Sequence, residues 1–225
     1  MESTNTYYVS DFSKGLVYMF NDNWDFIGQN EFEFSPYYLI AVNISLYVTS
    51  LDAIYKVSND LNTIYAQYNA VDGIGSLYSG ICYNTADNFL YAALVGAINT
   101  KEIEVFDLNL NLVATIPTPN YLPVSISIFK KQIYVGTTQK IVLLIVNKSI
   151  ISSFPACNSI VNSLMIDKLG NIATACSEGV LNLYDSNKVL YRNVSIKTEP
   201  KLLAYDSKGR LVTISSSKII IFYQN

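Results

Sequence analysis

Four short runs of strand-forming residues follow one another near the middle of the chain: Leu77-Tyr-Ser-Gly-Ile-Cys-Tyr83, Phe89-Leu-Tyr-Ala-Ala-Leu94, Glu102-Ile-Glu-Val-Phe106 and Leu112-Val-Ala-Thr-Ile116. Each run has the length of a typical strand and is dominated by β-branched or aromatic residues. No segment of the chain keeps a helical periodicity with capping residues, so almost no helix is expected. The stretch therefore predicts an antiparallel sheet of four short strands.

The same pattern recurs about every 40 residues. The cores of the successive second strands are Tyr8-Val9, Tyr47-Val48, Tyr91-Ala92, Tyr134-Val135, Ile172-Ala173 and Leu211-Val212. A period of this length in an all-β sequence is typical of a β-propeller, which repeats one four-stranded unit around an axis. The sequence predicts a single all-β propeller domain over residues 1–225, with six repeats of four short antiparallel strands, A at the axis to D at the rim.

The connections between the expected strands carry residues that favour turns. Asp167-Lys-Leu-Gly170 and Asp206-Ser-Lys-Gly209 fall between A and B strands, where glycine supplies the positive φ of a tight hairpin. All six prolines fall between a D strand and the next A strand, where they remove no ladder donor. These prolines are Pro36, Pro117, Pro119, Pro123, Pro155 and Pro200.

The expected strands are two short of six complete blades. The chain is predicted to begin on a B strand, Thr6–Asp11, and to end on a C strand, Lys218–Tyr223, so the terminal blades are incomplete. Three arrangements remain open: two three-stranded blades that meet at a seam, a five-bladed ring with a surplus hairpin, or an open ring completed by a partner chain. An unpaired terminal edge strand would also favour self-association, because its backbone donors and acceptors are free.

Composition argues against several classes of partner. The chain has 15 basic and 18 acidic residues, a net charge of -3 and no basic stripe, so nucleic acid is not expected to bind. No run of about 18 apolar residues predicts a transmembrane segment. The first residues lack the basic and apolar regions of a secretory signal peptide, so a cytoplasmic or virion-associated protein is expected.

The sequence offers few routes to catalysis. It contains no histidine, which removes Ser-His-Asp and Cys-His arrangements and histidine-ligated metals. No glycine-rich phosphate-binding loop occurs either. The three cysteines follow no Cys-x-x-Cys spacing, and Cys82 and Cys176 lie in strand-like segments, where buried free thiols are expected. These features favour a protein that is not an enzyme and has no cofactor.

Loop carboxylates are the remaining candidates for chemistry. The D–A and B–C loops share one face of a propeller, and Asp11, Asp52, Asp72 and Glu199 fall in them. Several of these side chains could converge and bind Ca²⁺ through oxygen ligands. Solvated loop charges are the alternative interpretation. A calcium-dependent hydrolase or lactonase-like propeller thus stays open as a second function.

Aromatic residues in and near the loops are candidates for contact with a partner. Tyr37, Tyr38, Tyr121 and Phe154 lie in or beside D–A links, where they could contact a protein or a glycan, or act as wedges between blades. Trp24 falls at a C–D turn on the outer rim, where burial is difficult, so it is also a candidate binding residue.

Parts of the repeat resemble two propeller families. Residues 103–128, which include Val113-Ala-Thr-Ile-Pro117 and the proline-containing link that follows, look like one unit of the YVTN-type propellers, and Leu46-Tyr-Val-Thr-Ser50 is close to that family's naming motif. Met165-Ile-Asp-Lys-Leu-Gly-Asn-Ile-Ala173 is similar to the A–B hairpin of NHL-type propellers. The resemblance implies the fold. Members of this superfamily serve as cell-surface or scaffold modules, ligand-binding domains and some hydrolases.

These observations favour a non-enzymatic interaction or scaffold propeller that presents its loop face to a protein partner. A lectin-like propeller that binds glycans is a further alternative, because stacked tyrosines with Asn and Asp side chains suit sugars. The low charge, the absence of histidine and the YVTN-like repeat also resemble structural or accessory proteins of archaeal viruses.

Overall fold

The computed structural model describes residues 6–71, 73, 75–96, 100–215 and 218–222 of the 225-residue chain. Over this part of the chain it contains 22 strands and no helix. The first three blades are built from β1 (Tyr7–Asp11), β2 (Leu16–Phe20), β3 (Phe26–Glu31), β4 (Leu39–Val42), β5 (Ser45–Thr49), β6 (Ala53–Ser58), β7 (Ile64–Asn69), β8 (Leu77–Asn84), β9 (Phe89–Val95), β10 (Lys101–Phe106) and β11 (Leu112–Pro117). The other three blades are built from β12 (Pro123–Phe129), β13 (Gln132–Thr137), β14 (Ile141–Val146), β15 (Ser149–Pro155), β16 (Val161–Ile166), β17 (Ile172–Cys176), β18 (Val180–Tyr184), β19 (Leu190–Ser195), β20 (Pro200–Tyr205), β21 (Leu211–Ser215) and β22 (Ile219–Phe222).

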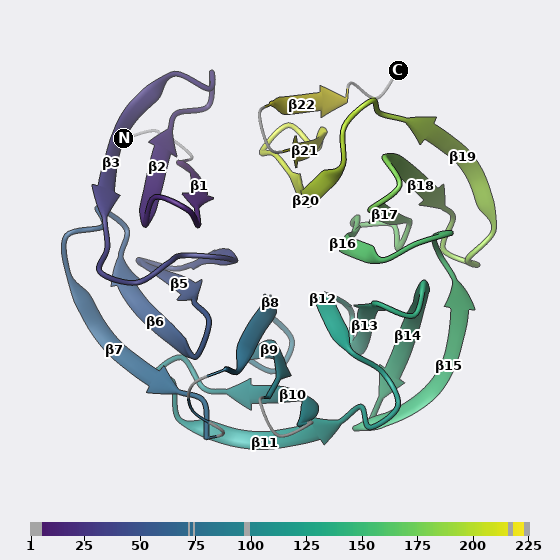
Figure 1. The fold of residues 1–225 in the computed structure, drawn as a ribbon, viewed down its shortest axis with the longest axis horizontal. Helices are drawn as coiled ribbons and strands as arrows, with labels where there is room; N and C mark the ends of the chain where they lie inside the picture. The colour runs from purple at the N-terminus through teal and green to yellow at the C-terminus, as the bar shows by residue number, and fades with distance from the viewer. Residues whose placement is uncertain (1–5, 72, 74, 97–99, 216–217, 223–225) are drawn as a thin grey trace.

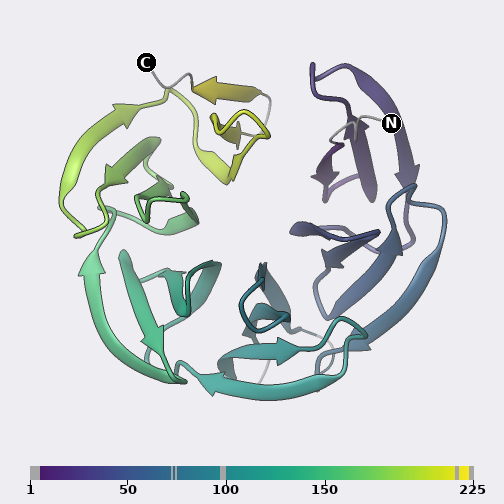
Figure 2. The same cartoon turned by 180° about the vertical axis from the view of Figure 1, so that it is seen from behind.

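The strands form six antiparallel sheets arranged around a ring (Figure 1; Figure 2 shows it from behind). Four sheets contain four strands each, whereas the described residues of the first and last sheets provide three each, β1-β2-β3 and β20-β21-β22. The predicted six-bladed propeller is therefore confirmed. The five-bladed alternative is wrong, because β1, β2 and β3 pair with one another instead of joining the last blade.

Turn chemistry matches the expected hairpins. Gly170 and Gly209 have φ angles of 90° and 73°, as predicted for the A–B turns. Asp206 Oδ1 accepts hydrogen bonds from the backbone amides of Lys208 and Arg210, and Asp167 makes the equivalent bonds one blade earlier. The prolines lie at the predicted end of the blades, although four of them are the terminal residues of strands: Pro117, Pro123, Pro155 and Pro200.

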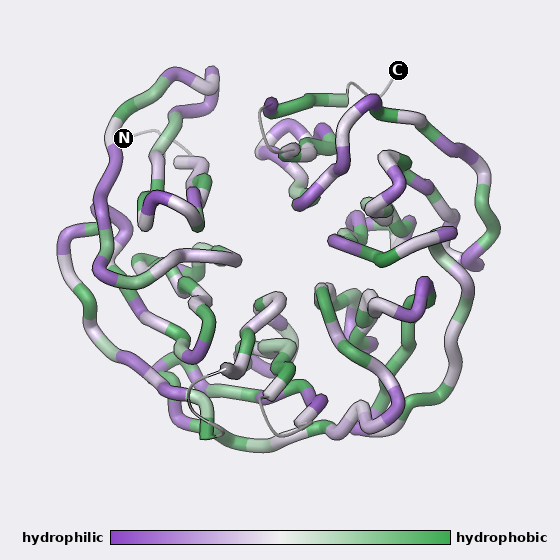
Figure 3. The backbone as a smooth tube through the Cα atoms, in the orientation of Figure 1, coloured by the Kyte–Doolittle hydropathy of each residue, from purple (hydrophilic) through white to green (hydrophobic). Residues whose placement is uncertain are grey.

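Apolar side chains are packed between the blades. Five clusters of buried residues each join two consecutive blades, from the first–second pair to the fifth–sixth pair. The cluster between the second and third blades, for example, contains Tyr47, Tyr78, Leu90 and Phe106. Middle strands such as β14 are hydrophobic throughout, because both of their faces are buried between blades, whereas exposure alternates along outer strands such as β7 (Figure 3 shows the hydropathy). Among the described residues, no such cluster joins the sixth blade to the first.

Every outer strand is bulged where it begins. In the five blades whose outer strand lies within the described residues, the register between the outer strand and its neighbour shifts at this point, so one apolar residue there has no cross-strand partner. These residues are Ile27, Tyr65, Val113, Ile151 and Tyr191, and all are exposed. Bulges interrupt the backbone ladder, so the outer edges are poor templates for another strand.

Candidate functional site

A cavity of about 470 Å³ lies at the centre of the ring and extends towards the seam, which is the contact between the β1-β2-β3 sheet and the β20-β21-β22 sheet. Consecutive residues of β1, β4, β8, β12, β16 and β20 line it, because their edges face the axis. Its described lining residues include no Asp, Glu, Lys or Arg, and most of the wall is apolar. The cavity suits a neutral ligand better than an ionic one.

The first blade presents aromatic residues to the seam. The Tyr7 and Trp24 rings are stacked with centroids 4.6 Å apart, and the Phe20 ring lies 6.1 Å from the Trp24 ring. Phe26 adds an edge-to-face contact with Phe20 at 6.1 Å. The Trp24 Nε1 atom is buried and has no hydrogen-bond acceptor. A buried N–H without an acceptor among the described residues is costly, so the stacking of the Trp24 ring is obtained at the expense of a hydrogen bond.

The last blade presents aliphatic residues to the same space. Ala204 pairs with Val212 and Leu202 pairs with Ile214 across the β20–β21 ladder, and all four line the cavity. Paired residues of antiparallel strands share a face, so these side chains form one apolar wall. Their neighbours Leu203 and Leu211 face the other way, into the cluster with the fifth blade.

At one end of the ring a polar contact bridges the seam. The Tyr7 hydroxyl lies 2.7 Å from Ser207 Oγ and accepts a hydrogen bond of 3.0 Å from the Ser207 amide. Ser207 Oγ also donates to Asp22 Oδ1 at 3.2 Å. These groups are exposed, so water competes for the same bonds. We conclude that the bridge positions the two blades without providing a packed core.

At the other end, Tyr38 reaches across the channel. Its hydroxyl donates to the backbone oxygen of Asn162 in the fifth blade at 3.0 Å. Burial, together with the neighbouring Tyr37, raises the pKa of the Tyr38 hydroxyl well above its usual range. The Asn162 amide in turn donates to Glu199 Oε1 at 2.9 Å, and Glu199 pairs with Lys201 at 2.7 Å. The hydrogen bond from Lys201 is the main reason that the pKa of Glu199 is lowered.

The candidate carboxylates of the loop face have partners of their own or stand apart. Asp11 is held by Ser13 and Lys14, and the hydrogen bond from Ser13 is the largest cause of its lowered pKa. Asp52 lies half-buried between β5 and β6, in a different blade from Glu199. Asp72 falls outside the described residues. Within the part of the chain that the structure describes, no three carboxylate or cysteine side chains are grouped to hold a metal ion.

The structure shows the surroundings of the two aromatic candidate residues, Tyr121 and Trp24. Tyr121 is partly buried and packs against the cluster between the third and fourth blades, as the wedge interpretation requires. Trp24 was expected to be exposed on the rim, and this expectation is wrong: it adopts a positive φ of 65° and stacks on Tyr7, half-buried beside the seam. Sequence reasoning missed the partners Tyr7, Ser207 and Asn162, because contacts between distant blades leave no local pattern.

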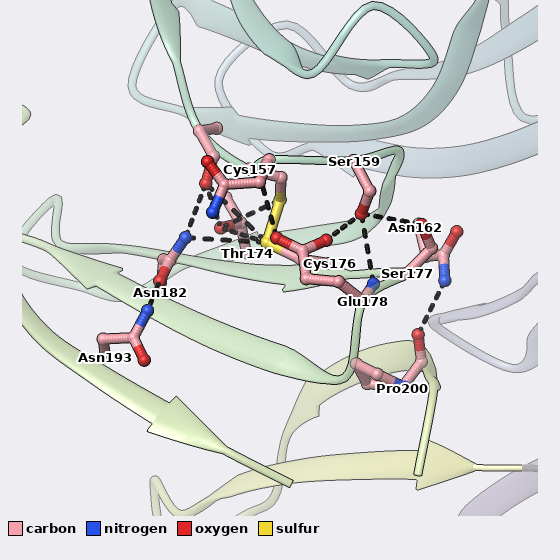
Figure 4. The surroundings of a disulfide bond; sticks show 12 residues. Cys157, Ser159, Asn162, Thr174, Cys176, Ser177, Glu178, Asn182, Asn193 and Pro200 are labelled. Carbon is pink, nitrogen blue, oxygen red and sulfur yellow. Dashed lines mark hydrogen bonds between the residues drawn. A yellow bond between two sulfur atoms is a disulfide. The ribbon is translucent and has the colours of Figure 1, made fainter. Parts of the chain in front are cut away.

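The cysteines differ in part from the expectation. Cys82 is a buried free thiol, as predicted. Cys176 is not free: it forms a disulfide with Cys157, 19 residues earlier, so that the link after β15 is tied to the end of β17 (Figure 4). Beside the bond, the backbone oxygen of Ala156 accepts hydrogen bonds from Asn182 and Tyr184, both 2.8 Å long. The disulfide therefore fixes one link of the loop face.

Comparison with known proteins identifies the fold alone. No protein-family model matches the chain, and no curated protein is similar to it in sequence. A solved structure of a protein of unknown function from Bacteroides caccae matches with a TM-score of 0.76 and 14% identity, over 95% of this chain and 83% of that one. The Pan2 WD40 domain of Neurospora crassa matches with a TM-score of 0.70 and 11% identity, over 99% and 76% of the two chains. The chain thus has the fold of a β-propeller, and the YVTN- and NHL-type resemblance stays a prediction.

A third neighbour was solved with a partner. It is the structure of BBS1N in complex with ARL6DN, with a TM-score of 0.69 and 11% identity, over 98% of this chain and 75% of that one.

No helix in the described residues is long and apolar enough to span a membrane.

Proposed function

We propose that this propeller is a non-enzymatic interaction or scaffold module whose loop face binds a protein partner. The loop face is the end of the ring formed by the B–C and D–A loops. One observation carries the proposal: four large apolar side chains are exposed in these loops, namely Phe12 (41%), Leu51 (47%), Val71 (82%) and Ile160 (39%). Apolar side chains set among polar loops are typical of the centre of a protein interface.

The local sequence supports a specific contact. Phe12 follows Asp11, and Leu51 precedes Asp52, so each loop offers an apolar group beside a carboxylate. In this proposal Asp11, Asp52, Tyr121 and Glu199 form the polar rim of the interface, where charges set orientation more than affinity. Propellers of similar fold occur in protein complexes, including BBS1N in complex with ARL6DN.

The experiment compares the two faces of the ring. Leu51→Lys and Val71→Lys place charges on the loop face, whereas Ile44→Lys and Leu169→Lys place them on the opposite face, where both wild-type side chains are 77% exposed. We expect proteins captured by the wild type to be lost with the first pair and retained with the second. Equal loss with both pairs, or binding to a glycan array that accounts for the loop-face effect, would overturn the proposal.

The finer assignment rests on sequence resemblance. We propose membership of the YVTN/NHL-type superfamily and a structural or accessory role in a virus, in the cytoplasm or on the virion. The supporting residues are those of the 103–128 unit and Leu46–Ser50. Identification of the neighbouring genes tests this part of the proposal directly.

A further inference from the structure

The central cavity, here called the seam cavity, includes the space inside β1, where each of the other five blades has an inner strand among the described residues. Five inner strands, β4, β8, β12, β16 and β20, surround the axis, and each begins a sheet that continues outwards to the rim. The first blade instead starts with β1, which lies farther from the centre of the ring than β8, β12 or β20 (Figure 1). The cavity lies along β1, whose residues 7–10 all line it.

In the other blades, the inner strand contributes apolar side chains to the interface with the preceding blade. Ile126 of β12, Leu164 of β16 and Leu203 of β20 each contribute to the apolar cluster between their own blade and the preceding one. Within the described residues, nothing equivalent stands between the aromatic face of the first blade and the wall that contains Val212 and Ile214. A single strand placed inside β1 would contact both faces.

The open edge of β1 points to a peptide. Among the described strands, β1 pairs with β2 alone, so its other edge faces the cavity without a partner strand. The β1–β2 ladder runs without a register shift, so the inner edge of β1 keeps a regular row of backbone groups. A peptide supplies backbone donors and acceptors for this edge, which a hydrocarbon chain does not.

We infer that the seam cavity binds an uncharged, extended peptide segment of another protein, which pairs with the inner edge of β1 and covers the seam faces of the first and last blades. The neutral walls set the chemistry of the segment, because a buried charge there would have no partner. This site is separate from the loop face and does not depend on it.

The chain provides its own probe for the experiment. A blocked synthetic peptide with the sequence of β16, Val161-Asn-Ser-Leu-Met-Ile166, has the properties of an inner strand and contains no tryptophan or tyrosine. Trp24 is the only tryptophan of the chain and lies at the cavity, so its fluorescence reports occupancy. We expect a saturable change in this fluorescence and a higher melting temperature with the peptide.

Backbone methylation separates strand pairing from nonspecific apolar binding. Alternate N–H groups of a strand point to opposite sides, so only one side of the bound peptide faces β1. Two peptides, one N-methylated at alternate residues and the other at the remaining residues, should therefore differ at least tenfold in affinity. Equal affinities, or no binding of the unmodified peptide at millimolar concentration, would overturn the inference.

Variants of the protein provide the matched controls. Ala204 is exposed and lines the cavity, so Ala204→Phe fills the site without displacing a buried side chain and should weaken the peptide at least tenfold. Ala86→Phe, in an exposed turn far from the seam, should leave the affinity unchanged. If dodecanoate reproduces the Trp24 signal and the peptide does not, the site takes lipid-like ligands. If light scattering shows dimers that the peptide fails to dissociate, a second copy covers the seam. Either result overturns the inference.

Discussion

Two contacts between neighbouring blades differ in their packing. The interface between the second and third blades contains a cluster of buried apolar residues, whereas the described residues of the seam between the sixth and first blades contain no such cluster. Tyr47, Tyr78 and Phe106 are fully buried between the second and third blades. At the seam, Tyr7, Phe20 and Trp24 form an aromatic face that is only half-buried, beside a cavity. The same repeat thus gives a packed interface where both blades have an inner strand, and a less buried one at the seam, where the described residues of the first blade provide three strands.

The difference shows where the ring derives its stability and where it can be opened. Apolar area removed from water stabilises a fold in rough proportion to that area, so the five clusters dominate the free energy of unfolding. The seam depends on the bridge between Tyr7 and Ser207, which involves few atoms. Local opening should therefore begin at the seam, because it has the fewest buried apolar contacts.

The largest expected effect comes from a pair of equivalent phenylalanines. Phe106 and Phe20 are the last residues of β10 and β2, the strands next to the outer strand in their blades, and each pairs with the first residue of that bulged outer strand. We expect Phe106→Ala to lower the free energy of unfolding by about 4 kcal/mol, as for other buried phenylalanines. Phe20→Ala should cost only about 1 kcal/mol, because the side chain is half-buried already. Urea unfolding measures both values.

Similar losses for the two variants would contradict the comparison, since they would mean that the seam in solution is as well packed as the other interfaces. Leu90→Ala provides a second fully buried site in the same cluster as Phe106. A large loss there together with a small loss at Phe20 would confirm that the position around the ring decides the effect.

Much of the fold was predictable, because it depends on local patterns. Strand length, turn residues such as Gly170 and Gly209, and the period of about 40 residues are all local signals, and together they specified six blades and the positions of the first and last strands. They could not specify how the ring closes at the seam. The contact of Tyr7 with Ser207 spans 200 residues and involves only a hydroxyl and an amide.

The candidate site was less predictable, for two physical reasons. Trp24 turns inwards because its backbone takes a left-handed conformation, which asparagine and glycine signal in a sequence and tryptophan does not. Cys157 and Cys176 are brought together by the return of the chain through the A–B hairpin of the fifth blade, and no spacing rule describes that path. Cys82, which lies within a strand, followed the ordinary expectation for a buried thiol.

The next effect concerns the disulfide that joins the link after β15 to the end of β17, in a part of the ring with packed interfaces. Reduction removes a cross-link between residues 19 apart and should lower the free energy of unfolding by about 3 kcal/mol. The measurement is urea unfolding with and without a reductant. The Cys157→Ser/Cys176→Ser variant should show no response to the reductant, whereas Cys82→Ala should keep the full response. A response that persists in the double variant would assign the effect elsewhere.

A smaller effect concerns the turn that carries Ser207 to the seam. Burial opposes the charge of Asp206, but hydrogen bonds from Arg210 and Lys208 lower its pKa below the ordinary value of 3.8. Because the folded pKa is depressed, ionised Asp206 stabilises the protein above about pH 4, and this contribution is lost as the pH falls through the folded value. We expect a loss of about 1–2 kcal/mol from this carboxylate between pH 5 and strongly acidic pH. Thermal unfolding of Asp206→Asn should be less acid-sensitive than that of the wild type, and an unchanged acid response would exclude this role.

The smallest effect compares two tyrosine hydroxyls that bridge blades. The Tyr47 hydroxyl donates to the backbone oxygen of Leu108 at 2.7 Å within a closed interface, whereas the Tyr7 hydroxyl meets Ser207 at the exposed end of the seam. Tyr47→Phe should cost about 1 kcal/mol, because it removes one buried hydrogen bond between blades and leaves Lys56 Nζ, at 2.8 Å, as the remaining donor to the same carbonyl oxygen. Tyr7→Phe should cost less than about 0.5 kcal/mol, since water replaces the lost contacts. Hydrogen exchange should nevertheless accelerate in β1 and β20 of Tyr7→Phe while the amides of β9 and β13 keep their wild-type protection. Faster exchange throughout the ring would instead show that the seam and the closed interfaces unfold as one unit.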